Sequence, residues 1–185
     1  MGGFHTFPVE RADDLEDVTR FRFCSREELL GHLDAGRDAT VADLGSGTGF
    51  YTDELAPFLG TVYAVDVQQA MGAYYRSKGL PDNIRPVTAA VETLPFPTDS
   101  LDGAVSTMTF HESTTEEGLR ELSRVLAGGG TLVVVDWSAQ GRGESGPPRD
   151  ERFDAADARS MLDDASFDVG IAAERSETLF VRATA

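Results

Sequence analysis

A short apolar run that breaks into three glycines spaced two apart, at residues 41–51, constrains the fold more than any other stretch. Its sequence, Val-Ala-Asp-Leu-Gly-Ser-Gly-Thr-Gly-Phe-Tyr, predicts a strand, a tight turn and the start of a helix. Glycines adopt backbone conformations closed to other residues and let a ligand approach the main chain without meeting a Cβ. Asp43 lies near the carboxyl end of the strand, where α/β proteins hold their ligands. We therefore expect a ligand site here, although an ordinary Gly-rich connection would also explain the stretch taken alone.

A second acidic residue closes the next predicted strand, Thr61–Asp66. This strand is almost continuously apolar, as is typical of a strand buried on both faces of a parallel sheet. Asp66 lies 17 residues after Gly49 (66 − 49), about where a chain returns beside its first strand after one crossover helix. A carboxylate at this point can accept the protons of both ribose hydroxyls. A helix cap is the alternative role, and the position after the Gly-rich loop favours the ribose.

The rest of the chain alternates predicted helices and strands. Apolar spacing predicts two short helices, Glu10–Arg20 and Ser25–Leu33, within an N-terminal helical preface over residues 1–38. Further on we expect helices at 68–78, at about 114–127 (capped by Ser113 or Thr114 and stopped by three glycines) and from 154, and strands at 84–88, 101–107, 131–137, 167–173 and 178–183. The pattern predicts an α/β fold over residues 39–185, Rossmann-like and doubly wound. Its mostly parallel seven-stranded sheet would end in an antiparallel hairpin.

The charge of the chain argues against several partners. It has 32 acidic and 16 basic residues, and its formal net charge of −16 opposes binding to nucleic acids and to anionic membranes. Lys78 is the only lysine among the basic residues. Acidic excess with almost no lysine is typical of proteins from salt-loving archaea, where salt screens the self-repulsion. An acidic protein from a high-GC organism is the alternative.

Other compositional features indicate a cytoplasmic protein without a metal site. Cys24 is the only cysteine, which excludes an intramolecular disulfide and favours a reducing compartment. We expect no signal peptide, since the first eight residues have neither a basic start nor an apolar stretch, and no apolar run is long enough for a membrane span. The three histidines, at 5, 32 and 111, are scattered and predict no set of metal ligands.

Four ordered segments resemble motifs of the class I S-adenosylmethionine-dependent methyltransferases. They are residues 41–49, 62–66, 94–102 and 122–132. The most similar members are small-molecule enzymes, among them the ubiquinone and menaquinone biosynthetic methyltransferases. The resemblance implies transfer of a methyl group from S-adenosylmethionine to a small-molecule acceptor by in-line displacement, with S-adenosylhomocysteine as the product.

The resemblance also implies a cofactor-binding set. Its positions are Asp43, Gly45, Ser46, Gly47, Asp66, Val67, Met71, Ala90, Val91 and Thr107. The glycine loop would lie beside the methionine part. Asp43 would help to orient its amino group, directly or through water, and the backbone carbonyl of Thr107 would meet the same group. Asp66 would take the ribose hydroxyls, and Val67 and Met71 would lie against the adenine.

One position departs from the family pattern. The family usually has an acid that accepts the adenine amino group where this chain has Ala90. The backbone amide of Val91 can still donate to the ring. A neutral hydrogen bond contributes only about 0.5–1.5 kcal/mol. The missing acid therefore affects the expected affinity for the cofactor more than the assignment of the chain to this family.

The predicted acceptor end follows the strands at 101–107 and 131–137. His111 follows the first of them and either removes a proton from the acceptor or hydrogen-bonds locally to position its loop. Asp136 and Trp137 end the second strand and either line the acceptor pocket or, for Trp137, pack under the polar loop at 138–152. The shortness of that loop favours a small or exposed acceptor. No motif specifies the acceptor itself or the oligomeric state.

Two other classes of function share these features. A cofactor-binding sensor or partner subunit would need the same loop without catalysis. A nicotinamide-dependent oxidoreductase would share the loop and Asp66, but its fingerprint spaces the last two glycines three apart. Here Gly47 and Gly49 are two apart, which disfavours that class.

Overall fold

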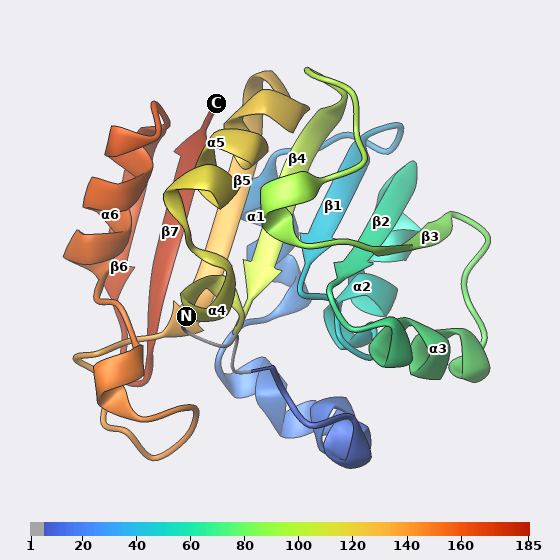
Figure 1. Ribbon diagram of the computed structural model, residues 1–185, viewed down its shortest axis with the longest axis horizontal. Coiled ribbons are helices and arrows are strands. Elements are labelled where there is room, and N and C mark those ends of the chain that lie inside the picture. Colours follow the sequence, from blue (N-terminus) through green and yellow to red (C-terminus); the bar gives the residue numbers. More distant parts are fainter. Residues whose placement is uncertain (1–5) are drawn as a thin grey trace.

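The computed structural model describes residues 6–185, so the first five residues of the predicted preface, His5 included, lie outside the described residues. Seven strands form one sheet in the order β3-β2-β1-β4-β5-β7-β6 (Figure 1). Their bounds are β1 Thr40–Leu44, β2 Thr61–Asp66, β3 Ile84–Thr88, β4 Leu101–Thr107, β5 Leu126–Trp137, β6 Asp168–Glu174 and β7 Thr178–Thr184. The first five strands pair in parallel, and β7 runs antiparallel to both β5 and β6. The predicted fold, with its terminal hairpin, is confirmed.

Six α-helices and five short 3₁₀ helices connect the strands of the described chain. The α-helices are α1 Arg26–Leu33, α2 Phe50–Leu55, α3 Gln69–Lys78, α4 Phe110–Ser113, α5 Glu116–Val125 and α6 Ala155–Asp164. The 3₁₀ helices are η1 Val9–Glu16, η2 Val18–Arg22, η3 Ala56–Phe58, η4 Val91–Thr93 and η5 Arg149–Glu151. Ser25 caps α1 as predicted, because its side chain accepts a hydrogen bond from the Glu28 amide at 3.2 Å.

Two helices differ from the expectation. The predicted helix Glu10–Arg20 is a pair of 3₁₀ helices separated at Asp17, whose side chain accepts from the Thr19 amide. A local hydrogen bond from a backbone amide to a nearby side chain competes with the hydrogen bonds that would continue the helix. The helix after β4 begins later than predicted: Thr115 is its cap, since residues 110–113 form the separate helix α4. The three glycines after this helix already belong to β5, because the chain becomes extended at Leu126.

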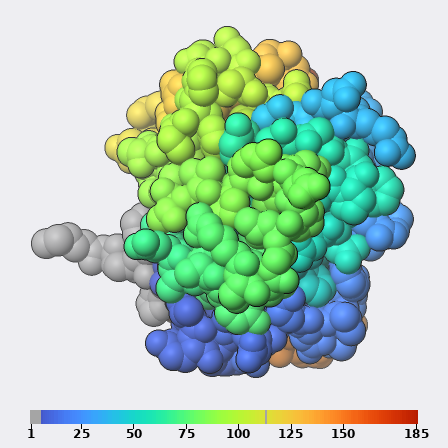
Figure 2. Space-filling view, turned by 90° about the vertical axis from the view of Figure 1, so that its right-hand side faces the viewer, coloured from blue at the N-terminus to red at the C-terminus, as the bar shows by residue number. Residues whose placement is uncertain are grey.

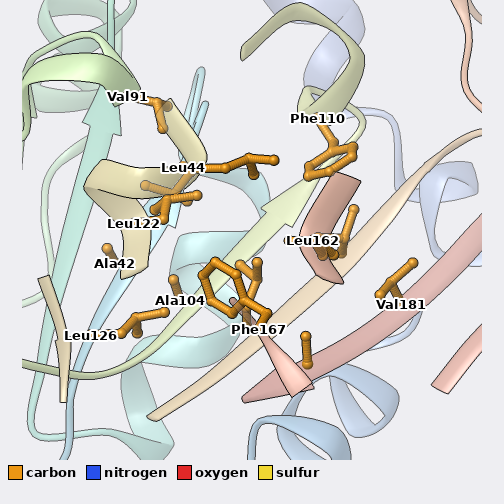
Figure 3. Close-up of a cluster of buried hydrophobic side chains, with 14 of the residues drawn as sticks. Ala42, Leu44, Val91, Ala104, Phe110, Leu122, Leu126, Leu162, Phe167 and Val181 are labelled. Atoms are coloured by element: carbon orange, nitrogen blue, oxygen red, sulfur yellow. The ribbon is translucent and has the colours of Figure 1, made fainter. Parts of the chain in front are cut away.

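The central strands β1 and β4 are buried on both faces, as expected for parallel strands. On β4, Ala104 belongs to the cluster under α5 and α6, and Val105 belongs to the cluster under α1, α2 and α3. Figure 3 shows the first cluster, where Leu122 of α5 and Leu162 of α6 pack against the sheet. Successive residues of β4 after Asp102 therefore enter apolar layers on opposite faces of the sheet.

The segment before β1 packs against the sheet. Leu29 and Leu33 of α1 are buried in the same cluster as Val41 of β1. The division of the chain at residue 38 stays a prediction, because these contacts neither require nor exclude it.

The order of the strands fixes where a ligand can bind. From β1 the chain proceeds outward to β2 and β3 and then crosses back to β4, so the order reverses between β1 and β4. Open α/β sheets hold ligands outside the carboxyl ends of the strands at such a point. The N-terminal segment (residues 6–22) and the 138–152 loop both lie at this edge of the sheet (Figure 1). Figure 2 shows the N-terminal segment, in blue, lying along the lower side of the molecule beneath the atoms coloured green.

Candidate active site

A cavity of about 660 Å³ opens at the reversal point. The Gly-rich loop, the ends of β2 and β4, the N-terminal segment and the 138–152 loop form its wall. All but one of the predicted site residues line it: Gly45, Ser46, Gly47, Asp66, Val67, Met71, Ala90, Val91, Thr107 and His111. The structure therefore brings the predicted residues together at one place, and Asp43 lies outside the wall.

The Gly-rich loop needs glycine for two separate reasons. Gly45 and Gly49 have φ of +70° and +83°, a region that side chains disfavour. A Cβ at Gly45 would also lie 2.5 Å from Thr109 Oγ1, and one at Gly49 would lie 2.1 Å from the ring of Tyr75. The amides of Gly45 and Ser46 both donate to the carbonyl of Val65, at 2.8 and 2.9 Å, which ties the loop to β2.

Asp66 connects the loop to the chain after β2. Its Oδ2 accepts from the Gly47 amide and its Oδ1 from the Gln68 amide, each at 2.8 Å. Burial raises the pKa of this carboxyl, although both amides act to lower it. Each oxygen keeps a further lone pair, so a carboxylate that lines the cavity can still accept from a ligand hydroxyl. The ribose role of Asp66 stays a prediction.

Asp43 lies beneath the loop with a side-chain oxygen unused by the protein. It is 1% exposed, and its Oδ2 accepts from Thr52 Oγ1 at 2.6 Å. Its Oδ1 has no hydrogen-bond partner within residues 6–185. Burial raises the pKa of Asp43 to about 6. A buried carboxylate with one free acceptor is costly unless a ligand satisfies it.

Arg20 of η2 supplies a positive charge at the same end of the cavity. Its guanidinium lies 4.9 and 5.2 Å from the ring centroids of Phe50 and Tyr51, and Nη1 donates to the carbonyl of Leu15 at 2.6 Å. Burial lowers the pKa of Arg20, and the charge of Asp43 partly opposes this effect. Sequence reasoning missed Arg20, because its contact with Phe50 and Tyr51 arises only in the folded chain and has no local sequence signal.

The opposite end of the cavity is apolar. Met71 is 1% exposed and Val67 is 49% exposed, and both line the wall together with Ala90 and Val91 of the loop before and within η4. Gln68 joins this end to the N-terminal segment, because its Nε2 donates to the carbonyl of Phe7 at 3.0 Å. A flat aromatic ring suits such a lining better than a charged group does.

His111 and Asp136 form a pair at the third corner of the cavity. His111 Nδ1 lies 2.9 Å from Asp136 Oδ2, and the His111 backbone amide donates to the same oxygen at 2.6 Å. A proton on Nδ1 leaves the lone pair of Nε2 available to the cavity. Burial alone would lower the pKa of His111, but the hydrogen bond and charge of Asp136 outweigh it and the pKa is raised. Sequence reasoning named both residues without joining them.

Glu112 lies beside this pair and was not singled out from the sequence. It lines the cavity, and its Oε1 is 3.8 Å from His111 Nε2. Burial, helped by the charges of Asp136 and Asp66, raises the pKa of Glu112 to about 7. Glu112 can therefore exchange a proton near neutral pH.

The 138–152 loop lines one side of the cavity and is held there by specific contacts. Arg152 is 7% exposed and donates to the carbonyls of Ser145 and Pro147, at 2.6 and 2.5 Å. Gly146 packs on Trp137 so closely that a Cβ there would lie 2.5 Å from the indole. Trp137 thus both lines the cavity and packs under the loop, so the two predicted roles occur together.

The described part of the chain has neither a metal-ligand cluster nor a membrane-spanning helix. Residues 6–185 contain no group of three histidine, cysteine, aspartate or glutamate side chains arranged to hold a metal ion. Nor does any helix over the same residues have the length and apolar character needed to cross a membrane.

Comparison with known proteins relates the chain to methyltransferases. The family model described as "Methyltransferase domain" matches residues 42–134. The ubiquinone/menaquinone biosynthesis C-methyltransferase UbiE of Pectobacterium atrosepticum is 34% identical over 110 residues, 55% of this chain and 44% of that protein. The protein of the same name from Shewanella sp. is 32% identical over 152 residues, 74% of this chain and 58% of that one. The chain therefore spans about half the length of these curated relatives.

A solved structure matches along nearly its whole length. The crystal structure of a SAM dependent methyltransferase from Aquifex aeolicus superposes with a TM-score of 0.88 and 30% sequence identity. The match covers 97% of this chain and 99% of that one.

Proposed function

The chain belongs to the methyltransferase-domain family, and from this premise we propose that it transfers a methyl group from S-adenosylmethionine to a small-molecule acceptor. The observation that carries the proposal is the Gly-rich loop, held by Asp66, above a buried Asp43 whose Oδ1 lacks a partner. That oxygen fits an ammonium group, and a phosphate at the same place would be repelled by it.

The wall of the cavity, with Asp43 buried beneath it, offers a partner for each part of the cofactor. Asp43 and the carbonyl of Thr107 would hold the amino group, and the guanidinium of Arg20 would face the carboxylate. Asp66 would accept from the ribose hydroxyls. The glycine loop would supply backbone next to the methionine part.

The adenine end rests on fewer polar groups. Val67 and Met71 would lie against the ring, and the Val91 amide would donate to it. Ala90 provides no side-chain acceptor for the adenine amino group, so apolar contact must supply much of the affinity here.

The residues at the acceptor end would remove a proton. When bound, S-adenosylmethionine supplies a methyl group activated by the sulfonium charge, and the remaining task of the protein is to align the acceptor, which can contribute ~7–11 kcal/mol. His111 Nε2 would accept the acceptor proton, and Asp136 would hold the imidazole and stabilise its cationic form.

Calorimetry with S-adenosylhomocysteine and with NAD tests the cofactor. We expect S-adenosylhomocysteine to bind, Asp66→Ala to weaken it strongly, and His111→Ala to weaken it less. Binding of NAD alone would overturn the proposal. A larger effect of His111→Ala would mean that the ribose assignment is misplaced.

Transfer of a labelled methyl group to a cell extract, followed by identification of the product, tests the reaction. We expect a labelled small molecule. Tight cofactor binding without transfer at any salt concentration would instead favour the alternative function, a sensor or partner subunit.

We propose further that the protein comes from a salt-loving archaeon and works in its cytoplasm. The net charge of −16 and the single lysine support high-salt adaptation. The lone buried Cys24 supports a reducing compartment. The free energy of unfolding should rise steeply with KCl, and a value independent of salt would contradict the adaptation.

A further inference from the structure

We propose that the methyl acceptor is an amine that enters the cavity as an ammonium ion, an inference that rests on the proposed methyl transfer. The acceptor end of the cavity combines two carboxylates without a lysine or arginine partner, an indole and two prolines with a histidine that can take a proton.

Two carboxylates of the cavity wall have no lysine or arginine partner. Glu112 and Glu151 both line the cavity. In the described chain neither forms an ion pair with a lysine or arginine, and the basic group beside Glu112 is His111, whose Nε2 lies 3.8 Å from Glu112 Oε1. Once His111 has no proton, this carboxylate has no cation beside it. An acidic acceptor would meet repulsion here as well as the net charge of −16. An ammonium group would relieve both carboxylates.

The arginines near the cavity are committed elsewhere. Arg11 pairs with Asp14 at 2.8 Å, and Arg20 lies over Phe50 at the Gly-rich loop. Arg152 does not line the cavity, and its strongest donors go to loop carbonyls. Its guanidinium also lies over the Trp137 ring, 5.8 Å from the centroid, so it shares the indole but forms no ion pair with Glu112 or Glu151.

The remaining wall suits the organic part of an amine. Trp137, Pro147 and Pro148 line the cavity on the side of Glu151. Aromatic rings attract ammonium groups through their faces and also bury apolar carbon. A carboxylate next to an indole is thus better matched to an alkylammonium or arylalkylammonium ion than to a neutral or an anionic acceptor.

The proton balance also fits an amine. An ammonium ion has no lone pair, so it must first give one proton to His111 Nε2 or to the carboxylate of Glu112. The nitrogen lone pair then forms the new N–C bond while the pair of the C–S bond goes to sulfur. The products are an N-methylammonium ion and S-adenosylhomocysteine, and the proton on the protein is released to water.

The test uses three probes of similar shape on the full chain saturated with S-adenosylhomocysteine. They are 2-phenylethylamine, 2-phenylethanol and 3-phenylpropionate, titrated at about pH 8, above the pKa of Glu112 of about 7. We expect the amine to bind at least about tenfold more tightly than the other two. Glu112→Gln and Glu151→Gln should each remove most of that preference and leave the affinity for S-adenosylhomocysteine unchanged. Glu117→Gln, at an exposed position of α5, is the matched control and should change neither affinity.

The possible outcomes separate the two proposals. Equal or tighter binding of the alcohol or the acid overturns the amine, and so does the absence of saturable binding by all three probes while S-adenosylhomocysteine binds. Failure of S-adenosylhomocysteine to bind overturns the proposed function itself. Thermal unfolding of each variant shows whether a loss of binding is a loss of fold.

Discussion

His111 and Asp136 are 25 residues apart in the chain and meet at the carboxyl edge of the sheet, with His111 Nδ1 2.9 Å from Asp136 Oδ2. Asp136 is 1% exposed, and it also accepts from the backbone amides of His111 and Trp137. Its orientation is thus set by the backbone, and it can hold the imidazole in one tautomer. This pair is the part of the cavity that is most directly suited to proton transfer.

The first prediction concerns this pair. His111→Gln should lower kcat about 100-fold or more, the usual effect of removing a general base, with the affinity for S-adenosylhomocysteine unchanged. Asp136→Asn should lower kcat and also move the acid limb of the pH profile to lower pH, because the charge that raises the pKa of His111 is lost. The measurement is labelled-methyl transfer against pH with the acceptor found in the extract. A loss of kcat with an unmoved acid limb would mean that Asp136 only supports the loop.

The sequence was sufficient to predict the fold and the residues that line the cavity around the Gly-rich loop. There each element carries its own local signal: the spaced glycines at 45–49, the acid that ends β2 and the apolar runs of the strands. The predicted cap at Ser25 was also right, because a cap depends only on its own helix.

The acceptor end depends on contacts between segments far apart in the chain. His111 meets Asp136 only because β4 and β5 are neighbours in parallel register. Arg20 reaches the cavity through 3₁₀ helices, whose short turns have no strong periodic signal. Pro147 and Pro148 line the cavity in a loop whose carbonyls accept hydrogen bonds from Arg152. No local sequence pattern indicates these contacts.

The second prediction concerns Asp43, whose pKa is raised in the folded state from 3.8 to about 6. The folded state then binds more protons between these values, so the free energy of unfolding falls as pH rises through this window and stays reduced above it. Asp43→Asn should therefore stabilise the free protein at pH 7.5 by roughly 1–3 kcal/mol, while Thr52 can still donate to the amide oxygen. The same variant should weaken cofactor binding.

Denaturant unfolding at pH 7.5 and pH 4, at fixed high salt, checks the stability of this variant. The gain should be much smaller at the lower pH, where the wild-type carboxyl is already protonated. A variant less stable than the wild type at both pH values would show that burial of the Asp43 carboxylate does not lower the free energy of unfolding.

The third prediction separates the two reasons for glycine in the loop. Gly49→Ala places a side chain at φ +83° and also against the ring of Tyr75, so we expect a loss of about 2–5 kcal/mol in unfolding free energy. Gly79→Ala is the control without a contact, since Gly79 has φ +88° and nothing within 4 Å of the added Cβ, although its ψ of 132° differs from the 16° of Gly49. It should cost about 1–3 kcal/mol, from the backbone conformation alone. Equal losses in the two variants would mean that the contact with Tyr75 relaxes freely.

The fourth prediction concerns the wall of the cavity at residues 145–148. Arg152→Met removes a buried guanidinium that donates to the carbonyls of Ser145 and Pro147, so these groups must find water instead. Backbone amides of the 138–152 loop should then exchange hydrogen at least about tenfold faster, while amides of β1 and β4 keep their protection. Mass spectrometry of exchanged peptides measures both regions in one experiment. Arg120→Met, at an exposed position of α5, is the control and should leave the loop unchanged. Unchanged exchange in Arg152→Met would show that the contact of Gly146 with Trp137, rather than the guanidinium, holds the loop against the cavity.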